Sequence, residues 1–148
     1  MMQPHARLTD PRPASAKELR FIQHEIRLTA NDLGELKAKM KLATENSPTW
    51  KAMLEIRHRR VARLKKLQAE RADMVLRLKE RPLARPDLAD VIENMTNVEN
   101  AIVTQGYEGG LEALRAFIDY CVDDLERLDQ MGADATPDQT THPTTRGE

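Results

Sequence analysis

The spacing of apolar residues constrains this chain more than any other feature of its sequence. From residue 19 to residue 43, an apolar or small side chain recurs at alternating intervals of three and four. That spacing keeps one stripe on a single helix face over more than three heptads. The stripe consists of Leu19, Ile22, Ile26, Thr29, Leu33, Leu36, Met40 and Ala43. We therefore predict a long amphipathic helix in this part of the chain.

Local signals set the limits of this helix and begin a second one. Ser15 and Glu18 have the spacing of a capping box, so the first helix should begin near residue 16. Ser47 followed by Pro48 is typical of an N-cap and first helical residue, and it predicts the start of the next helix. A short connection implies antiparallel neighbours. Residues 16–80 are therefore predicted to form a long antiparallel helical hairpin, similar to a coiled coil.

A second, shorter hairpin is predicted from residue 87 to residue 131. The two prolines in RPLARP, residues 81–86, interrupt the helical pattern. Gly106 and Gly132 are expected to end the third and fourth helices. The expected apolar stripes are Leu88, Val91, Met95, Val98 and Ile102 in the third helix, and Leu111, Leu114, Ile118, Cys121, Leu125 and Leu128 in the fourth.

The composition agrees with an all-α fold. Aromatic residues make up only 3% of the 148 residues, so the core must be built from Leu, Ile, Val, Met and Ala packed between helices. Residues 1–15 and 132–148 are rich in proline or threonine and lack an apolar period, so they are predicted to be disordered tails. The single cysteine and the lack of a signal-peptide pattern favour the cytoplasm.

The two hairpins differ in predicted length, and this difference leaves two arrangements open. The short hairpin could complete a four-helix bundle, or the long one could protrude and meet another subunit. Helices of about 45 to 50 Å cannot be covered along their whole length by partners of roughly 30 Å. Part of the long hairpin is therefore expected to contact another chain, most simply a second copy in a dimer.

Charge is segregated along the sequence although the net charge is only -1. Residues 49–81 contain eleven Lys or Arg against four Asp or Glu, whereas residues 82–131 contain three against eleven. Helical projection divides the cations of the second helix into two groups. An outward basic ridge contains Arg59, Arg63, Lys66 and Arg77. A second group lies within the apolar stripe, where its charges would set the register of packing, and contains Arg57, Arg60 and Arg71.

The fourth helix carries an acidic ridge that could balance these cations. This ridge consists of Glu112, Asp119, Asp123 and Glu126. It could lie against the basic helix within one chain or between subunits, or both ridges could be solvated faces. The basic ridge could instead contact nucleic-acid phosphates.

The sequence contains no recognisable catalytic, metal-binding or cofactor pattern. The neighbouring carboxylates Asp123 and Asp124 point about 100° apart on a helix and cannot act as a dyad. His24 and His58 lie on separate helices without ligand partners, and Cys121 lies on an apolar stripe, where a buried thiol is expected. No membrane-spanning segment is expected. We therefore expect neither an enzyme nor a metal or cofactor site.

Two functions are compatible with these features. The first is a non-enzymatic helical interaction or assembly protein that binds itself or another helical protein by coiled-coil packing and charge complementarity. The alternative is an accessory protein that binds DNA or RNA phosphates through the basic helix predicted at residues 48–80.

Overall fold

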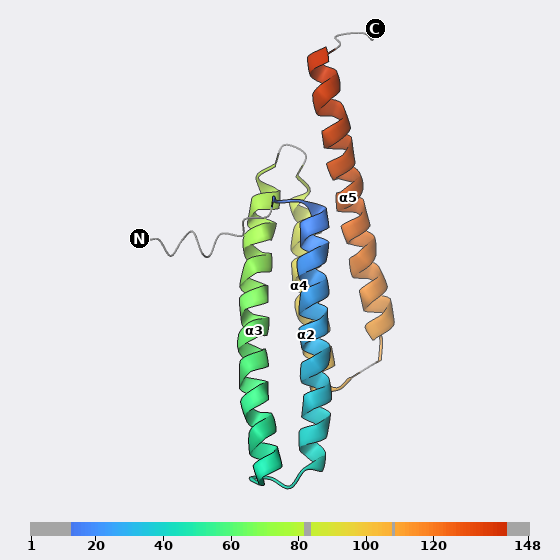
Figure 1. Cartoon of the computed structure of the whole chain (residues 1–148). Helices are drawn as coiled ribbons and strands as arrows, with labels where there is room; N and C mark the ends of the chain where they lie inside the picture. The colour runs from blue at the N-terminus through green and yellow to red at the C-terminus, as the bar shows by residue number, and fades with distance from the viewer. Residues whose placement is uncertain (1–12, 82–83, 108, 142–148) are drawn as a thin grey trace, which may run out of the picture.

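The computed structural model describes residues 13–81, 84–107 and 109–141 (Figure 1). In these ranges the chain forms four α-helices: α2 (Ala16–Leu42), α3 (Pro48–Lys79), α4 (Pro86–Gln105) and α5 (Leu111–Thr141). The described residues form no strand. The predicted all-α fold is therefore confirmed.

Serine side chains cap the first two helices at the predicted positions. The Ser15 hydroxyl accepts a hydrogen bond from the backbone N–H of Glu18 at 3.1 Å, and the Ser47 hydroxyl accepts one from Trp50 at 3.1 Å. Each bond satisfies one of the backbone donors that a helix leaves free at its N-terminus. Gly106 adopts the left-handed conformation at φ 89° and ends α4, as predicted.

The C-terminal part of the chain differs from the expectation at Gly132. Helix α5 does not end there but continues to Thr141, so residues 132–141 are helical in the structure rather than part of a tail. A glycine ends a helix by taking a positive φ angle, and the described glycines that do so are Gly106 and Gly110. Gly132 keeps a helical backbone and weakens the helix without stopping it. The tail predictions for residues 1–12 and 142–148 lie outside the described residues.

The two hairpins pack together around one core (Figure 1). Helix α2 contacts the other three helices, and α3 also contacts α4. Ile22 and Ile26 of α2, Met74 of α3, Ile92 of α4 and Ile118 of α5 belong to the same buried cluster. The short hairpin therefore packs on the long one and completes a four-helix bundle.

Helix α4 faces this core with a different side from the predicted one. Its buried residues are Ala89, Ile92, Thr96, Glu99 and Asn100. Val98, expected in the core, is 43% exposed, while Leu88, Val91 and Met95 pack only partly buried against the core. The buried residues of α4 also follow a helical period. One of them is the carboxylate Glu99, which a search for regularly spaced apolar residues does not find. Burial of Glu99 is possible because arginines on two other helices reach it.

The long hairpin extends beyond the cover that α4 and α5 provide. Leu36 is the last buried residue of α2 and Leu64 is the first buried residue of α3. Between them, residues 37–63 contain no buried residue. Figure 1 shows this end of the hairpin projecting past α4 and α5. We refer to residues 37–63 as the hairpin tip.

Candidate interaction surfaces

The predicted basic ridge on α3 does not form one uniform surface. Arg59 and Lys66 are exposed and have no ion pair with any other described residue. Arg63 donates from Nη2 to Glu25 Oε1 of α2 at 3.1 Å, and Arg77 donates from Nε to Asp73 Oδ2 at 3.2 Å. Two of the four cations are therefore engaged within the chain.

The three arginines expected in the packing seam have different surroundings. Arg57, Leu64, Arg71 and Leu78 follow one another at intervals of seven, so they lie on one face of α3. Within the bundle this face is covered, and Arg71 is only 1% exposed. On the hairpin tip the same face has no such cover, so Arg57 is exposed and Arg60 is only partly buried. Only Arg71 therefore has the buried position that the seam prediction requires.

Arg71 is incompletely paired in its buried position. Its Nη2 donates to Asn97 Oδ1, whereas its Nε and Nη1 have no hydrogen-bond partner among the described residues. Burial lowers the pKa of Arg71 to about 10, and the nearby carboxylates of Glu93 and Glu99 oppose part of this effect. The loss of hydration therefore outweighs the attraction of the two carboxylates.

The acidic ridge of α5 pairs with α2 rather than with the basic helix α3. Arg20 Nη2 lies 2.6 Å from Asp123 Oδ1 and 2.5 Å from Glu126 Oε1. Arg27 Nη2 lies 3.6 Å from Asp119 Oδ1. Glu112, the fourth member, is exposed and has no ion pair within the described chain. Within the described chain the acidic ridge is thus largely neutralised by Arg20 and Arg27, which belong to neither of the two predicted basic groups.

A buried ionic centre around Glu99 was not predicted. Glu99 is 1% exposed, and its Oε2 accepts from Arg27 Nε at 2.7 Å and from Arg115 Nε at 2.6 Å. Arg115 also donates from Nη2 to Asn31 Oδ1 at 2.9 Å. One carboxylate of α4 therefore joins α2 and α5. The period of Ala89, Ile92, Thr96 and Glu99 is the only sequence signal that could have indicated it.

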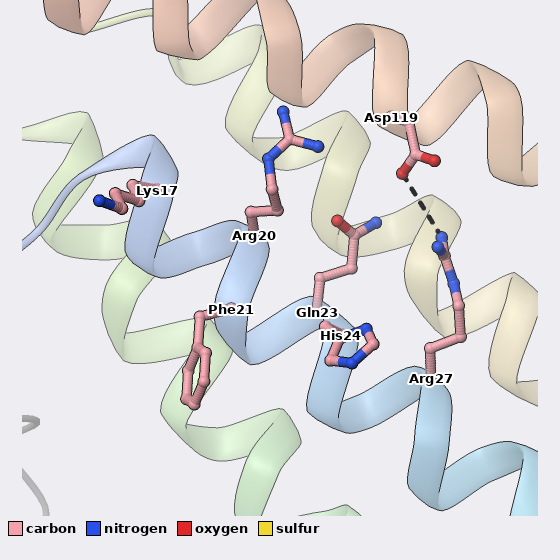
Figure 2. A pocket seen from close by; sticks show the side chains of 7 residues that line it. All are labelled: Lys17, Arg20, Phe21, Gln23, His24, Arg27 and Asp119. Carbon is pink, nitrogen blue, oxygen red and sulfur yellow. Dashed lines mark ion pairs between the residues drawn. The ribbon is translucent and has the colours of Figure 1, made fainter.

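A shallow groove runs along α2 beside this ionic layer (Figure 2). It is lined by Lys17, Arg20, Phe21, Gln23, His24, Arg27 and Asp119. In Figure 2 the dashed line joins Arg27 to Asp119, and Arg20 extends toward α5, where it meets two carboxylates. The ion pairs of Arg20 and Arg27 with carboxylates of α5 join α2 to α5 along this groove.

The remaining candidate for chemistry is Cys121, which is 4% exposed within the core. Burial raises the pKa of its thiol, so the reactive thiolate is disfavoured. Among the described residues, no group of three or more His, Cys, Asp or Glu side chains is placed to hold a metal ion.

The fold and these surfaces define a four-helix bundle with a projecting basic hairpin. No protein-family model, curated protein or solved structure matches the chain. Within the three described ranges, no helix combines the length and the apolar character needed to cross a membrane.

Proposed function

We propose that this protein is a non-enzymatic helical interaction and assembly protein whose main binding element is the hairpin tip. The observation that carries this proposal is that residues 37–63 contain no buried residue although α2 and α3 both continue through this region. The α3 part of the tip alone is about 24 Å long. Its apolar side chains Met53, Leu54 and Val61 remain partly exposed. A partner on the tip would cover them.

Self-association, most simply as a dimer, is expected through α5 rather than through the tip. Phe117 and Tyr120 lie three positions apart on α5 and are 48% and 61% exposed. Aromatic side chains are enriched at protein interfaces, and the buried hydrophobic residues of the described chain include none. Two tips facing one another would repel, because each contains eight Lys or Arg against two Asp or Glu. A second copy on the α5 face avoids this repulsion.

Light scattering on the full chain tests the self-association through α5. We expect a mass of twice 16.9 kDa at moderate salt, and we expect Phe117→Ser with Tyr120→Ser to shift the population toward the monomer. The matched control is Leu42→Ser, which changes an exposed apolar residue on the tip and should leave the mass unchanged. A monomer at every concentration that also captures no partner from its host would contradict the proposal.

Nucleic acid is the second candidate partner, and the charge of the tip favours it. The tip has a net charge of +6 from its eight cations and two carboxylates, while the whole chain has a net charge of -1. The rest of the chain therefore carries -7. An excess of cations concentrated at one projecting end is a surface on which phosphates can bind.

A further inference from the structure

The cations of the hairpin tip come from both of its helices. They are Lys37, Lys39, Lys41, Lys51, Arg57, Arg59, Arg60 and Arg63. Of these, Arg63 forms an ion pair, with Glu25, and the other seven form none with any described residue. All eight are exposed or partly buried. The tip thus presents an accessible basic surface on which, among the described residues, only Arg63 has an ion-pair partner.

A second copy of the chain is a poor source of anions for this surface. Three of the four acidic-ridge residues of α5 already pair with Arg20 or Arg27 of α2. Freeing Asp123 and Glu126 for another molecule would leave Arg20 without its ion-pair partners. The tip itself contains only Glu45 and Glu55 as carboxylates. An external polyanion therefore fits the tip better than the acidic face of another copy does.

We infer that the hairpin tip binds the phosphodiester backbone of a duplex nucleic acid, with Arg57 and Arg60 at the centre of the contact. This inference rests on the proposed function, in which the tip binds a partner. A duplex presents about one negative charge per 1.7 Å of its axis, so the α3 part of the tip, about 24 Å long, can span many phosphates. Single strands are bound by stacking bases on aromatic side chains, and the tip contains only Trp50, which is partly buried.

Arg57 and Arg60 are central because of where α4 stops covering α3. They lie seven residues before Leu64 and Leu67, so they are on the face of α3 that is buried in the bundle. On the tip this face is not buried. Neither arginine forms an ion pair with another described residue. A guanidinium group can donate two parallel hydrogen bonds to a phosphate. Arg59, between them in sequence, adds a third exposed cation.

Fluorescence anisotropy with duplexes of about 20 base pairs tests this inference. The test variant is Arg57→Gln with Arg60→Gln. The control is Arg85→Gln with Arg127→Gln, which removes the same charge from two exposed residues outside the tip. Each lost phosphate contact lowers the salt slope by about one, so the test variant should lose about two. When salt is raised from about 50 to about 200 mM, the affinity of the wild type should fall by a factor about ten times larger than the fall for this variant. The control should show the same fall as the wild type.

Three results would overturn the inference: equal weakening in the control, tighter binding to a single strand than to duplex DNA or RNA, or equal competition by polyglutamate or anionic lipid vesicles. Circular dichroism on each variant checks that the helices remain. Light scattering on the same samples separates the two proposals. If the wild-type protein self-associates but binds no duplex, this inference alone is disproved. If it does not self-associate, binds no duplex and captures no other partner, the proposed function is disproved as well.

Discussion

Glu99 shows how a single charged residue can be buried in a bundle core. Its carboxylate receives hydrogen bonds from Arg27 and Arg115, so the desolvated charge is compensated from two neighbouring helices. A buried ion group of this kind contributes little net stability, but removal of one partner leaves the other charges uncompensated. The cost of such a change is therefore large even though the benefit of the whole group is small.

Glu99→Gln should lower the free energy of unfolding by about 3 kcal/mol, because Arg115 loses its carboxylate partner and Arg27 keeps only the longer contact with Asp119, at 3.6 Å. Urea denaturation followed by circular dichroism measures this change. The control is Asp123→Asn, where the side chain is 56% exposed and Arg20 keeps Glu126. This control should cost less than about 1 kcal/mol. Equal effects of the two substitutions would show that the Glu99 centre behaves like a surface pair.

Arg71→Met should keep or raise the free energy of unfolding, by about 1 kcal/mol, because an apolar side chain of similar length has no hydration to lose. Burial already lowers the pKa of Arg71 to about 10, and two of its nitrogen atoms lack hydrogen-bond partners among the described residues. Arg57→Met, on the same face but exposed, is the control and should change stability little. A loss of more than about 2 kcal/mol in Arg71→Met would show that its attraction to Glu93 and Glu99 is the larger effect.

At the scale of helices, Gly34 explains how closely α2 and α4 can approach. A Cβ atom added at Gly34 would lie 2.7 Å from the backbone oxygen of Val103. That oxygen belongs to the backbone and cannot move aside as a side chain could. The glycine that weakens α2 as an isolated helix is therefore required where α2 packs against α4.

Gly34→Ala should lower the free energy of unfolding by about 1 to 3 kcal/mol, because the helices must separate to admit the methyl group. In a solvated helix the same substitution would stabilise by up to about 1 kcal/mol, so the sign of the effect reports the packing. Thermal and urea denaturation measure it. Gly109→Ala serves as the control, since an added Cβ there meets nothing within 4 Å. A stabilised Gly34→Ala variant would contradict the close approach.

At the scale of the whole molecule, the bundle and the hairpin tip should differ in local stability. The bundle contains every buried residue of α2 and α3, and the tip contains none. Regions with few buried apolar contacts open at lower free energy than the core. Hydrogen exchange read by mass spectrometry should therefore show faster exchange in residues 48–60 than in residues 64–78 of the same helix. Uniform protection along α3 in the monomer would contradict this expectation.

Duplex nucleic acid should slow the exchange of the tip while leaving the bundle unchanged, if the tip is the binding element. The comparison needs one sample with and one without duplex at low salt, where phosphate contacts are strongest. Protection confined to α5 instead would place the contact on the opposite hairpin.

Much of the fold could be predicted because local signals specify it. Ser15, Ser47 and Gly106 act within a few residues of themselves, so their roles are visible in the sequence. The predicted α2 stripe is buried from Leu19 to Leu36, whereas its last two members, Met40 and Ala43, lie on the hairpin tip and are only partly buried. The face of α4 could not be predicted in this way, because its burial depends on arginines that are distant in sequence.

The sequence by itself determined the helices of this protein, their order and the concentration of cations on α3. Only the tertiary structure decided what each charge does. Arg57 and Arg71 have equivalent positions on one helical face, yet one is exposed and the other buried. The difference arises from which part of α3 the second hairpin covers, and that depends on how helices distant in sequence pack together. The same packing pairs the acidic ridge with α2, which leaves the cations of the tip accessible to an external partner.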